Sequence, residues 1–153
     1  MALEIGNEYK DIASKIIDKY PLNFGHIEVE KVLFLKETEK SPKKYADIRA
    51  VRPPYTFMTE NKFIITFYEP VMDSLTSAQK IMVVYHELLH IDLDFNKVKG
   101  HNVEDFQEII SVFGSTWTID DNLPNILEDE DNAPEDIDRS TPEDLAYDEP
   151  EIL

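Results

Sequence analysis

Two histidines and a glutamate lie close together in the segment His86-Glu87-Leu88-Leu89-His90. Histidines four positions apart project from the same face of a helix, where both imidazoles can bind one zinc ion. Glu87 follows His86 by one position, about 100° further round such a helix, so it borders that face. A carboxylate there can act as the general base on a metal-activated water. The spacing therefore predicts a hydrolytic metal site with Glu87 as its catalytic base.

The residues around this motif predict that it lies on a buried helix. Thr76 and Gln79 form a capping-box pattern, which predicts a helix that begins there and ends at about residue 93. The other positions between 81 and 91 are apolar on nearly every side of this helix. Buried imidazoles and carboxylates need partners because their desolvation is costly. A structural pair of histidines is the alternative interpretation, and the buried setting favours the metal site.

A third ligand is expected, because a catalytic zinc site usually has three protein ligands and a water. We predict that His101, eleven residues after His90, is this ligand, with Glu104 the next choice. The alternative interpretation of His101 is a solvated loop histidine. The alternative interpretation of Glu104 is an acidic residue in the first turn of a helix, where the helix dipole favours it. The other carboxylate candidates are Glu108, Asp92 and Asp94.

Hydrophobic periodicity predicts the elements that position these residues. Apolar residues at helical spacing predict an N-terminal helix, and β-branched and aromatic runs predict three strands before the motif. A second helix is expected to begin near Asn102 and to end at Gly114. This order predicts an α+β, zincin-like domain with a small, mostly antiparallel sheet packed on the active-site helix. The predicted ranges are 3–19 for the first helix and 27–35, 44–51 and 62–68 for the strands.

The negative charge of the chain is concentrated towards its C-terminus. The 153 residues carry a net charge of −17, and residues 117–153 contain 14 acids and one base. We therefore predict a domain over 1–116 and an acidic, disordered tail over 117–153. Direct nucleic-acid binding is not expected, because it depends on clustered lysines and arginines. The chain has no cysteine, so a transition-metal site must use His, Asp or Glu.

Several segments together resemble a known family. YHELLHID followed by GHNVEDF resembles the phage metallopeptidase domain, in which a similar HELLHI segment precedes a His-x-Val-x-Asp-Phe block. YADIRAV (45–51) and FIITFYEPVMDSLTSAQK (63–80) are similar to the same family's strand and strand-to-helix junction. The resemblance covers roughly residues 40–114. A more distant similarity is to SprT-like proteases, although this chain lacks the cysteine-rich ribbon that many of them carry.

The resemblance implies a zinc-dependent metallopeptidase that hydrolyses peptide bonds in a peptide or protein substrate. On this analogy the zinc ligands are His86, His90 and His101, and Glu87 is the general base. In zincins the strand before the active-site helix binds substrate as an added antiparallel strand, which makes 63–68 the candidate substrate edge. Tyr85 or Tyr68 is a candidate to stabilise the oxyanion, with simple packing as the alternative.

Two other functions remain as alternatives. One is a zinc-binding but catalytically inactive interaction module, and the other is an acidic, DNA-mimic-like inhibitor of a basic partner. No secretory signal and no membrane span are recognisable, so we expect a protein of the bacterial or phage-infected host cytoplasm that does not contact membranes. The sequence does not indicate the oligomeric state.

Overall fold

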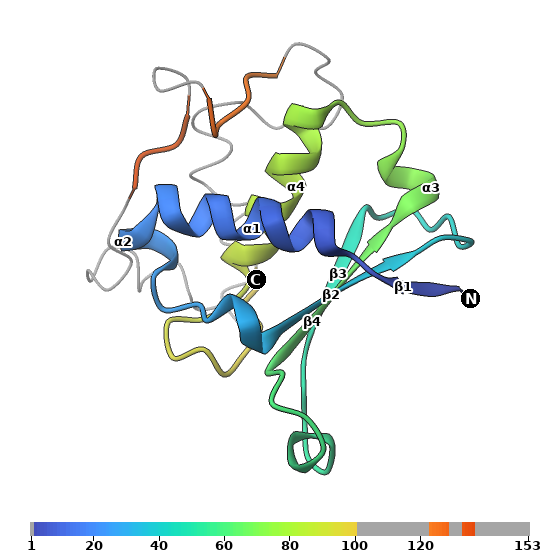
Figure 1. Ribbon diagram of the computed structural model, residues 1–153, viewed down its shortest axis with the longest axis vertical. Coiled ribbons are helices and arrows are strands. Elements are labelled where there is room, and N and C mark those ends of the chain that lie inside the picture. The colour runs from blue at the N-terminus through green and yellow to red at the C-terminus, as the bar shows by residue number, and fades with distance from the viewer. Residues whose placement is uncertain (1, 101–122, 129–132, 137–153) are drawn as a thin grey trace.

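The computed structural model describes residues 2–100, 123–128 and 133–136 of the chain. This part forms an α+β fold in which helices cover one face of a small sheet (Figure 1). None of the helices in these ranges is long and apolar enough to cross a lipid bilayer. The helices are α1 (Asn7–Lys19), α2 (Pro21–Phe24), α3 (Glu69–Met72) and α4 (Ser77–Leu89), with short 3-10 turns η1 (Val29–Lys31) and η2 (Tyr55–Phe57). The strands are β1 (Leu3–Ile5), β2 (Val32–Glu37), β3 (Ala46–Ala50) and β4 (Phe63–Tyr68).

The four strands form one mixed sheet in the order β1-β2-β4-β3. Two of its three pairings are antiparallel, β1 with β2 and β3 with β4, and β2 pairs with β4 in parallel. The predicted α+β class with a small, mostly antiparallel sheet is therefore confirmed. The strands predicted at 44–51 and 62–68 are confirmed as β3 and β4. The prediction of 27–35 begins too early, because residues 29–31 form η1 before β2.

The N-terminal residues differ from the prediction of one helix over 3–19. Residues 3–5 form β1, which pairs antiparallel with the end of β2, and α1 begins only at Asn7. Gly6 separates the two elements, and its N–H donates to the carbonyl of Phe34 at 2.9 Å. The helical spacing of Ile5 with Tyr9 was misleading, because the backbone of residues 3–5 satisfies its hydrogen bonds in the sheet.

The capping box of α4 is present as predicted. The Thr76 side chain accepts from the Gln79 N–H at 3.2 Å, and the Thr76 N–H donates to Gln79 Oε1 at 2.8 Å. Every residue of α4 from Ile81 to Leu89 is buried except His86. The helix ends at Leu89, with His90 as its C-cap, about four residues before the predicted end. A short loop follows the helix.

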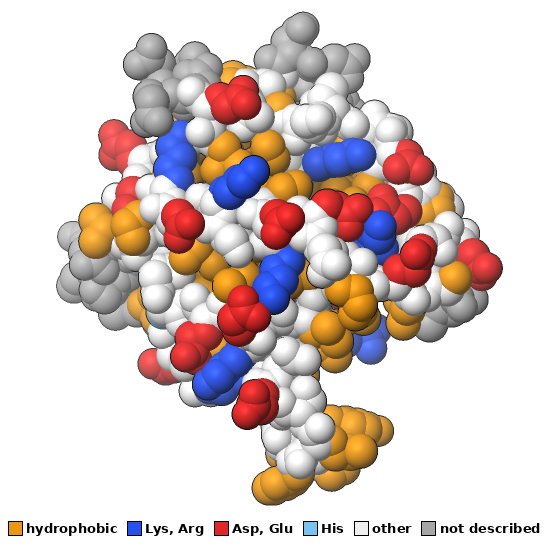
Figure 2. Space-filling model, in the orientation of Figure 1, with side chains coloured by type: hydrophobic (Ala, Val, Ile, Leu, Met, Phe, Trp, Pro, Cys, Tyr) orange, Lys and Arg blue, Asp and Glu red, His pale blue; other side chains and the backbone are white. Residues whose placement is uncertain are grey.

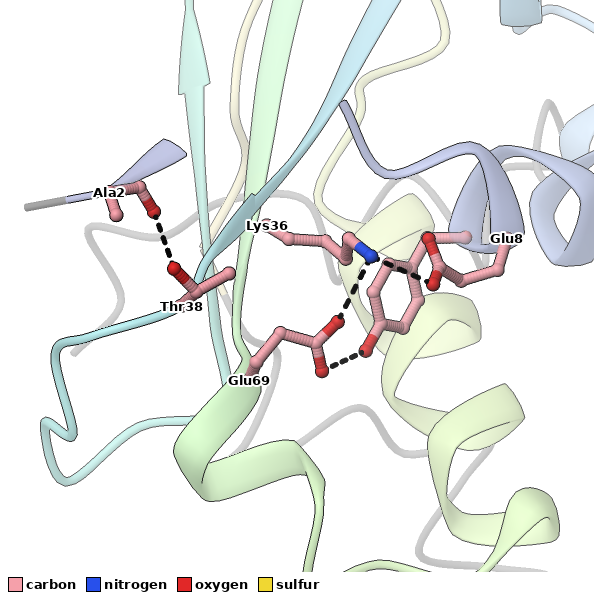
Figure 3. Close-up of polar contacts among 6 residues, drawn as sticks. Ala2, Glu8, Lys36, Thr38 and Glu69 are labelled. Atoms are coloured by element: carbon pink, nitrogen blue, oxygen red, sulfur yellow. Dashed lines mark hydrogen bonds and ion pairs between the residues drawn. The ribbon is translucent and has the colours of Figure 1, made fainter. Parts of the chain in front are cut away.

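The core lies between the sheet and the two long helices. Phe63, Ile65 and Phe67 of β4 point into this core and are fully buried. The ring of Tyr9 on α1 stacks on that of Phe67 with centroids 4.0 Å apart. The Tyr9 hydroxyl donates to Glu69 Oε2, and Lys36 joins Glu69 to Glu8 (Figure 3). Burial, followed by the charge of Glu69, raises the pKa of Tyr9 well above its usual value.

Two described segments of the predicted tail contact the domain. Leu123 and Ile126 are buried in the core, and the Ile126 carbonyl accepts from Lys19 Nζ. Asp136 accepts from the N–H groups of Leu22 and Asn23 at 3.0 and 2.8 Å. The remainder of 117–153 and the predicted helix after residue 101 lie outside the described residues. The domain boundary at 116 therefore stays a prediction.

The buried carboxylate of Glu37 organises the end of β2. Its oxygens accept from the backbone N–H groups of Ala2, Glu39 and Lys40 at 3.2, 2.6 and 2.8 Å. These hydrogen bonds, that of Lys40 above all, lower the pKa of Glu37 below its usual value. A carboxylate whose pKa is lower in the folded state stabilises the fold above its unfolded-state pKa, and this contribution is lost as the pH falls through the folded-state pKa.

The Glu37 network predicts a pH-dependent stability difference. Glu37→Gln should lower the free energy of unfolding at pH 7, because a neutral amide accepts these N–H bonds more weakly. The difference from wild type should narrow as the pH falls below about 4, where the unfolded chain takes up the proton, and should vanish below the folded-state pKa, where the folded carboxylate is also neutral. Urea unfolding at several pH values measures this. Glu60→Gln, at an exposed position in the connection between β3 and β4, is the control. A Glu37→Gln difference that is constant with pH would contradict the assignment.

The capping box predicts a local stability loss. Thr76→Ala should lower the free energy of unfolding by about 1 kcal/mol, because the Gln79 N–H loses its acceptor at the start of α4. Thr76→Ser keeps the hydroxyl and should retain most of the stability. Chemical denaturation of the two variants compares them directly, and equal stabilities would show that the cap contributes nothing.

Candidate metal centre

His86, Glu87 and His90 come together at the C-terminal end of α4. One potential ligand atom from each lies within 4.8 Å of the others. The two imidazole centroids are 5.2 Å apart, and the ring planes are inclined by 65°. Both rings therefore converge on one region beside the helix, with the Glu87 carboxylate at its border. In the described part of the chain, this is the group of side chains that is able to hold a metal ion.

The main chain of the following loop orients the His90 imidazole. His90 Nδ1 lies 2.7 Å from the carbonyl oxygen of Lys99, and the Lys99 N–H donates to the His90 carbonyl at 2.6 Å. Because a carbonyl only accepts, Nδ1 carries the proton, and in the neutral ring Nε2 presents its lone pair. This outer partner of His90 is a main-chain group, so no residue type in the sequence could predict it.

Asp92 shapes this loop. Its Oδ1 accepts from the N–H groups of Asn96 and Lys97 at 2.7 and 3.0 Å, and its own N–H donates to the Lys97 carbonyl at 3.0 Å. The ring of Phe95 packs against that of Phe63 on β4, with centroids 5.2 Å apart. The loop is thus fixed by the Asp92 carboxylate and by the packing of Phe95 in the core. This fixes the position of the Lys99 carbonyl that orients the His90 ring.

Glu87 is a buried carboxylate in an apolar helix. Its Oε2 has no hydrogen-bond partner among the described residues. The pKa of Glu87 is raised to about 7, chiefly by burial and also by the nearby charge of Asp47, while His86 and Lys44 partly oppose this shift. Asp47 on β3 and Lys44 just before it come near Glu87 because β3 lies beside α4. Such a carboxylate, with one oxygen that has no hydrogen-bond partner in the described residues, is suited to accept a proton.

The remaining ligand candidates are not joined to this group in the described residues. Asp92 is engaged by the loop backbone, and Asp94 is exposed. His101, Glu104 and Glu108 lie outside the described residues, so the third ligand stays a prediction.

The predicted substrate edge is wrong. β4 is paired on both sides, with β2 and with β3, so its backbone groups are not available to a substrate. Among the described strands it is β3 that forms this edge of the sheet, and α4 contacts β3. The error arose because the order of strands along the chain does not give their order in the sheet.

Tyr85 belongs to the core. It is fully buried, its hydroxyl accepts from Asn23 Nδ2 at 3.3 Å, and its ring packs edge-on against Tyr20 and Phe24. The structure supports the packing interpretation of this residue over a role in stabilising an oxyanion. Tyr68, on β4, is partly buried.

The comparison with protein families agrees with this geometry. A family model described as Putative phage metallopeptidase matches residues 1–128. The chain belongs to this family. The match extends well beyond the roughly 40–114 of the resemblance and includes the N-terminal elements and the described segment 123–128. No curated protein and no solved structure gives a significant match to the chain. A metallopeptidase family implies a metal ion, and the donors of His86, Glu87 and His90 fit one.

The loop geometry predicts that Asp92 supports metal binding without contacting the ion. Asp92→Ala should weaken the affinity for zinc by about tenfold, because the loop loses two backbone hydrogen bonds and the Lys99 carbonyl no longer fixes the His90 ring. Asp94→Ala, an exposed neighbour, is the matched control. Competition with a chromophoric chelator measures both affinities. Equal affinities of the two variants would refute this role for Asp92.

Proposed function

We propose that this protein is a zinc-dependent peptidase that hydrolyses peptide bonds at the site formed by His86, Glu87 and His90. The observation that carries the proposal is the convergence of two imidazoles and a buried carboxylate within 4.8 Å at the end of α4. Zinc is the expected ion because a cysteine-free site with imidazole donors suits it. The family match supports the peptidase assignment.

The residues of this site have separate roles. His86 and His90 hold the ion as neutral imidazoles, His90 through Nε2 because its Nδ1 donates to Lys99. When bound, zinc acts as a Lewis acid that polarises the scissile carbonyl and lowers the pKa of the attacking water. Glu87 accepts the proton of that water and passes it to the leaving amine. Its buried setting keeps the carboxylate away from bulk water, which strengthens its interaction with charge in the site.

His101 is the third ligand in this proposal. Two hydrogen bonds hold the backbone of Lys99 against His90, so the chain passes beside this ligand two residues before position 101. Two residues span at most about 7 Å, so chain length alone allows a side chain two positions after Lys99 to serve as a ligand beside His90. The sequence distance from His90 alone could not have supplied this constraint.

The substrate binds as an extended chain along β3. β3 pairs with β4 on one side only among the described strands, and it lies next to α4. An added antiparallel strand would satisfy the outer backbone groups of β3 and carry a peptide bond past Glu87. Backbone pairing tolerates many side chains, which is consistent with a peptide or unfolded protein as substrate.

The test combines metal content with proteolysis. The purified wild type should carry near-stoichiometric zinc and cleave a denatured, fluorophore-quenched protein. A chelator should abolish the cleavage, and added zinc should restore it. Glu87→Gln should retain zinc but lose at least about 100-fold in kcat/KM, because only the proton acceptor is removed. His90→Ala should lose both zinc and cleavage.

The results separate this proposal from the alternatives. Unchanged cleavage by Glu87→Gln would rule out its role as the base. Stoichiometric zinc without hydrolysis of any unfolded protein would instead favour the inactive binding module. Salt-sensitive binding to a basic partner that survives Glu87→Gln, and is lost when only residues 137–153 beyond the packed segments are removed, would favour the acidic inhibitor.

A further inference from the structure

The hairpin that joins β3 to β4 carries a cluster of exposed apolar side chains. Its tip, residues 52–61, projects from the body of the protein (Figure 1), and hydrophobic side chains gather there (Figure 2). The exposed fractions of Tyr55, Phe57 and Met58 are 63%, 87% and 77%. Phe57 and Met58 are the two most exposed large hydrophobic residues in the described part of the chain. Such a patch on a protruding element marks an interaction surface.

The backbone of the hairpin tip is ordered without help from these side chains. The N–H of Val51 donates to the carbonyl of Lys62 at 2.8 Å and closes the base of the hairpin. Within the tip, the N–H groups of Phe57 and Met58 donate to the carbonyls of Pro54 and Tyr55 at 3.0 and 2.9 Å. The apolar side chains are therefore displayed on a preorganised turn, which lowers the entropic cost of binding a partner.

The position of the hairpin tip indicates which partner it meets. The edge strand β3 lies beside α4 and runs directly into the tip. A peptide paired antiparallel to β3 therefore runs from the tip towards Glu87. At about 3.3 Å per residue, the five residue steps from Asp47 to Arg52 correspond to about five residues of the peptide. The part of the peptide at the tip therefore lies about five residues, or a few more, before the bond beside Glu87.

We propose that the hairpin tip binds an apolar segment of an extended polypeptide substrate, about four to eight residues amino-terminal to the cleaved bond. This inference rests on the proposed peptidase function and names its substrate class: unfolded chains with an exposed apolar stretch at this spacing. Phe57 and Met58 supply the apolar contact, and β3 supplies the register.

The experiment compares two quenched peptides that share the same cleaved region. One carries a Leu-Phe-Leu segment six residues before the cleaved bond, and the other carries Ser-Gly-Ser there. The wild-type kcat/KM should be about tenfold higher for the apolar peptide. The double variant Phe57→Ser, Met58→Ser should reduce this ratio to about one. Leu22→Ser, at a 60% exposed leucine on α2, is the matched control and should keep the wild-type ratio.

Several results would overturn the proposal. A double variant with the wild-type ratio would show that the hairpin tip does not contact substrate. A preference that stays the same when the apolar segment is moved to the carboxyl side of the cleaved bond would exclude the register along β3. Loss of binding to anionic lipid vesicles in the double variant, with an unchanged peptide ratio, would assign the tip to a membrane surface instead.

A failure of the peptidase function can be told apart from a failure of this proposal. If the wild type cleaves neither peptide, the peptidase assignment is contradicted, and fluorescence polarisation of the labelled peptides still measures their binding. Weaker binding of the apolar peptide to the double variant than to Leu22→Ser would then support recognition at the hairpin tip, and equal binding would refute it. Far-UV circular dichroism verifies that both variants are folded.

Discussion

The burial of α4 is the constraint on which the site depends. The helix is apolar on nearly every side and packs between α1 and the sheet, yet it carries two imidazoles and a carboxylate near its end. Polar groups in such a setting need partners that offset their desolvation. The Lys99 carbonyl meets this need for His90 Nδ1, whereas Glu87 Oε2 has no partner in the described residues. A cation held by the histidines would offset the desolvation of the Glu87 carboxylate. Metal binding is thereby linked to the stability of the core.

The sheet determines which surface faces this group. β3 is inserted at the edge beyond β4, although it precedes β4 in the chain, and β2 pairs with β4 in parallel. This arrangement brings Asp47 near Glu87 and leaves β3 as the outer strand on that side among the described strands. Neither the proximity of Asp47 to Glu87 nor the edge position of β3 can be predicted from residue patterns. The periodicity of a strand indicates which of its faces is buried, but not which strands pair with it. The wrong choice of β4 as substrate edge follows from this limit.

What the sequence predicted well depends on local chemistry. The Thr76–Gln79 capping box needs only four residues, and the four-residue spacing of His86 and His90 needs only one helical turn, so both appear in the structure. Features that need distant partners were missed. β1 forms because residues 3–5 meet β2, and the end of α4 at Leu89 is set by a loop whose backbone returns to His90. Leu123 and Ile126 likewise look like part of a polar tail until the core that buries them is known.

The early end of α4 also has an electrostatic consequence for the site. Because the helix stops at Leu89, His90 lies at the C-terminus, where the last carbonyl groups carry the negative end of the helix dipole. A cation beside His86 and His90 is favoured by this field, and a helix continuing to residue 93 would have moved that end away. The same stop frees residues 91–100 to turn back and hold the His90 ring. One helix terminus thus supplies both the field that attracts a cation and the loop that orients its ligand.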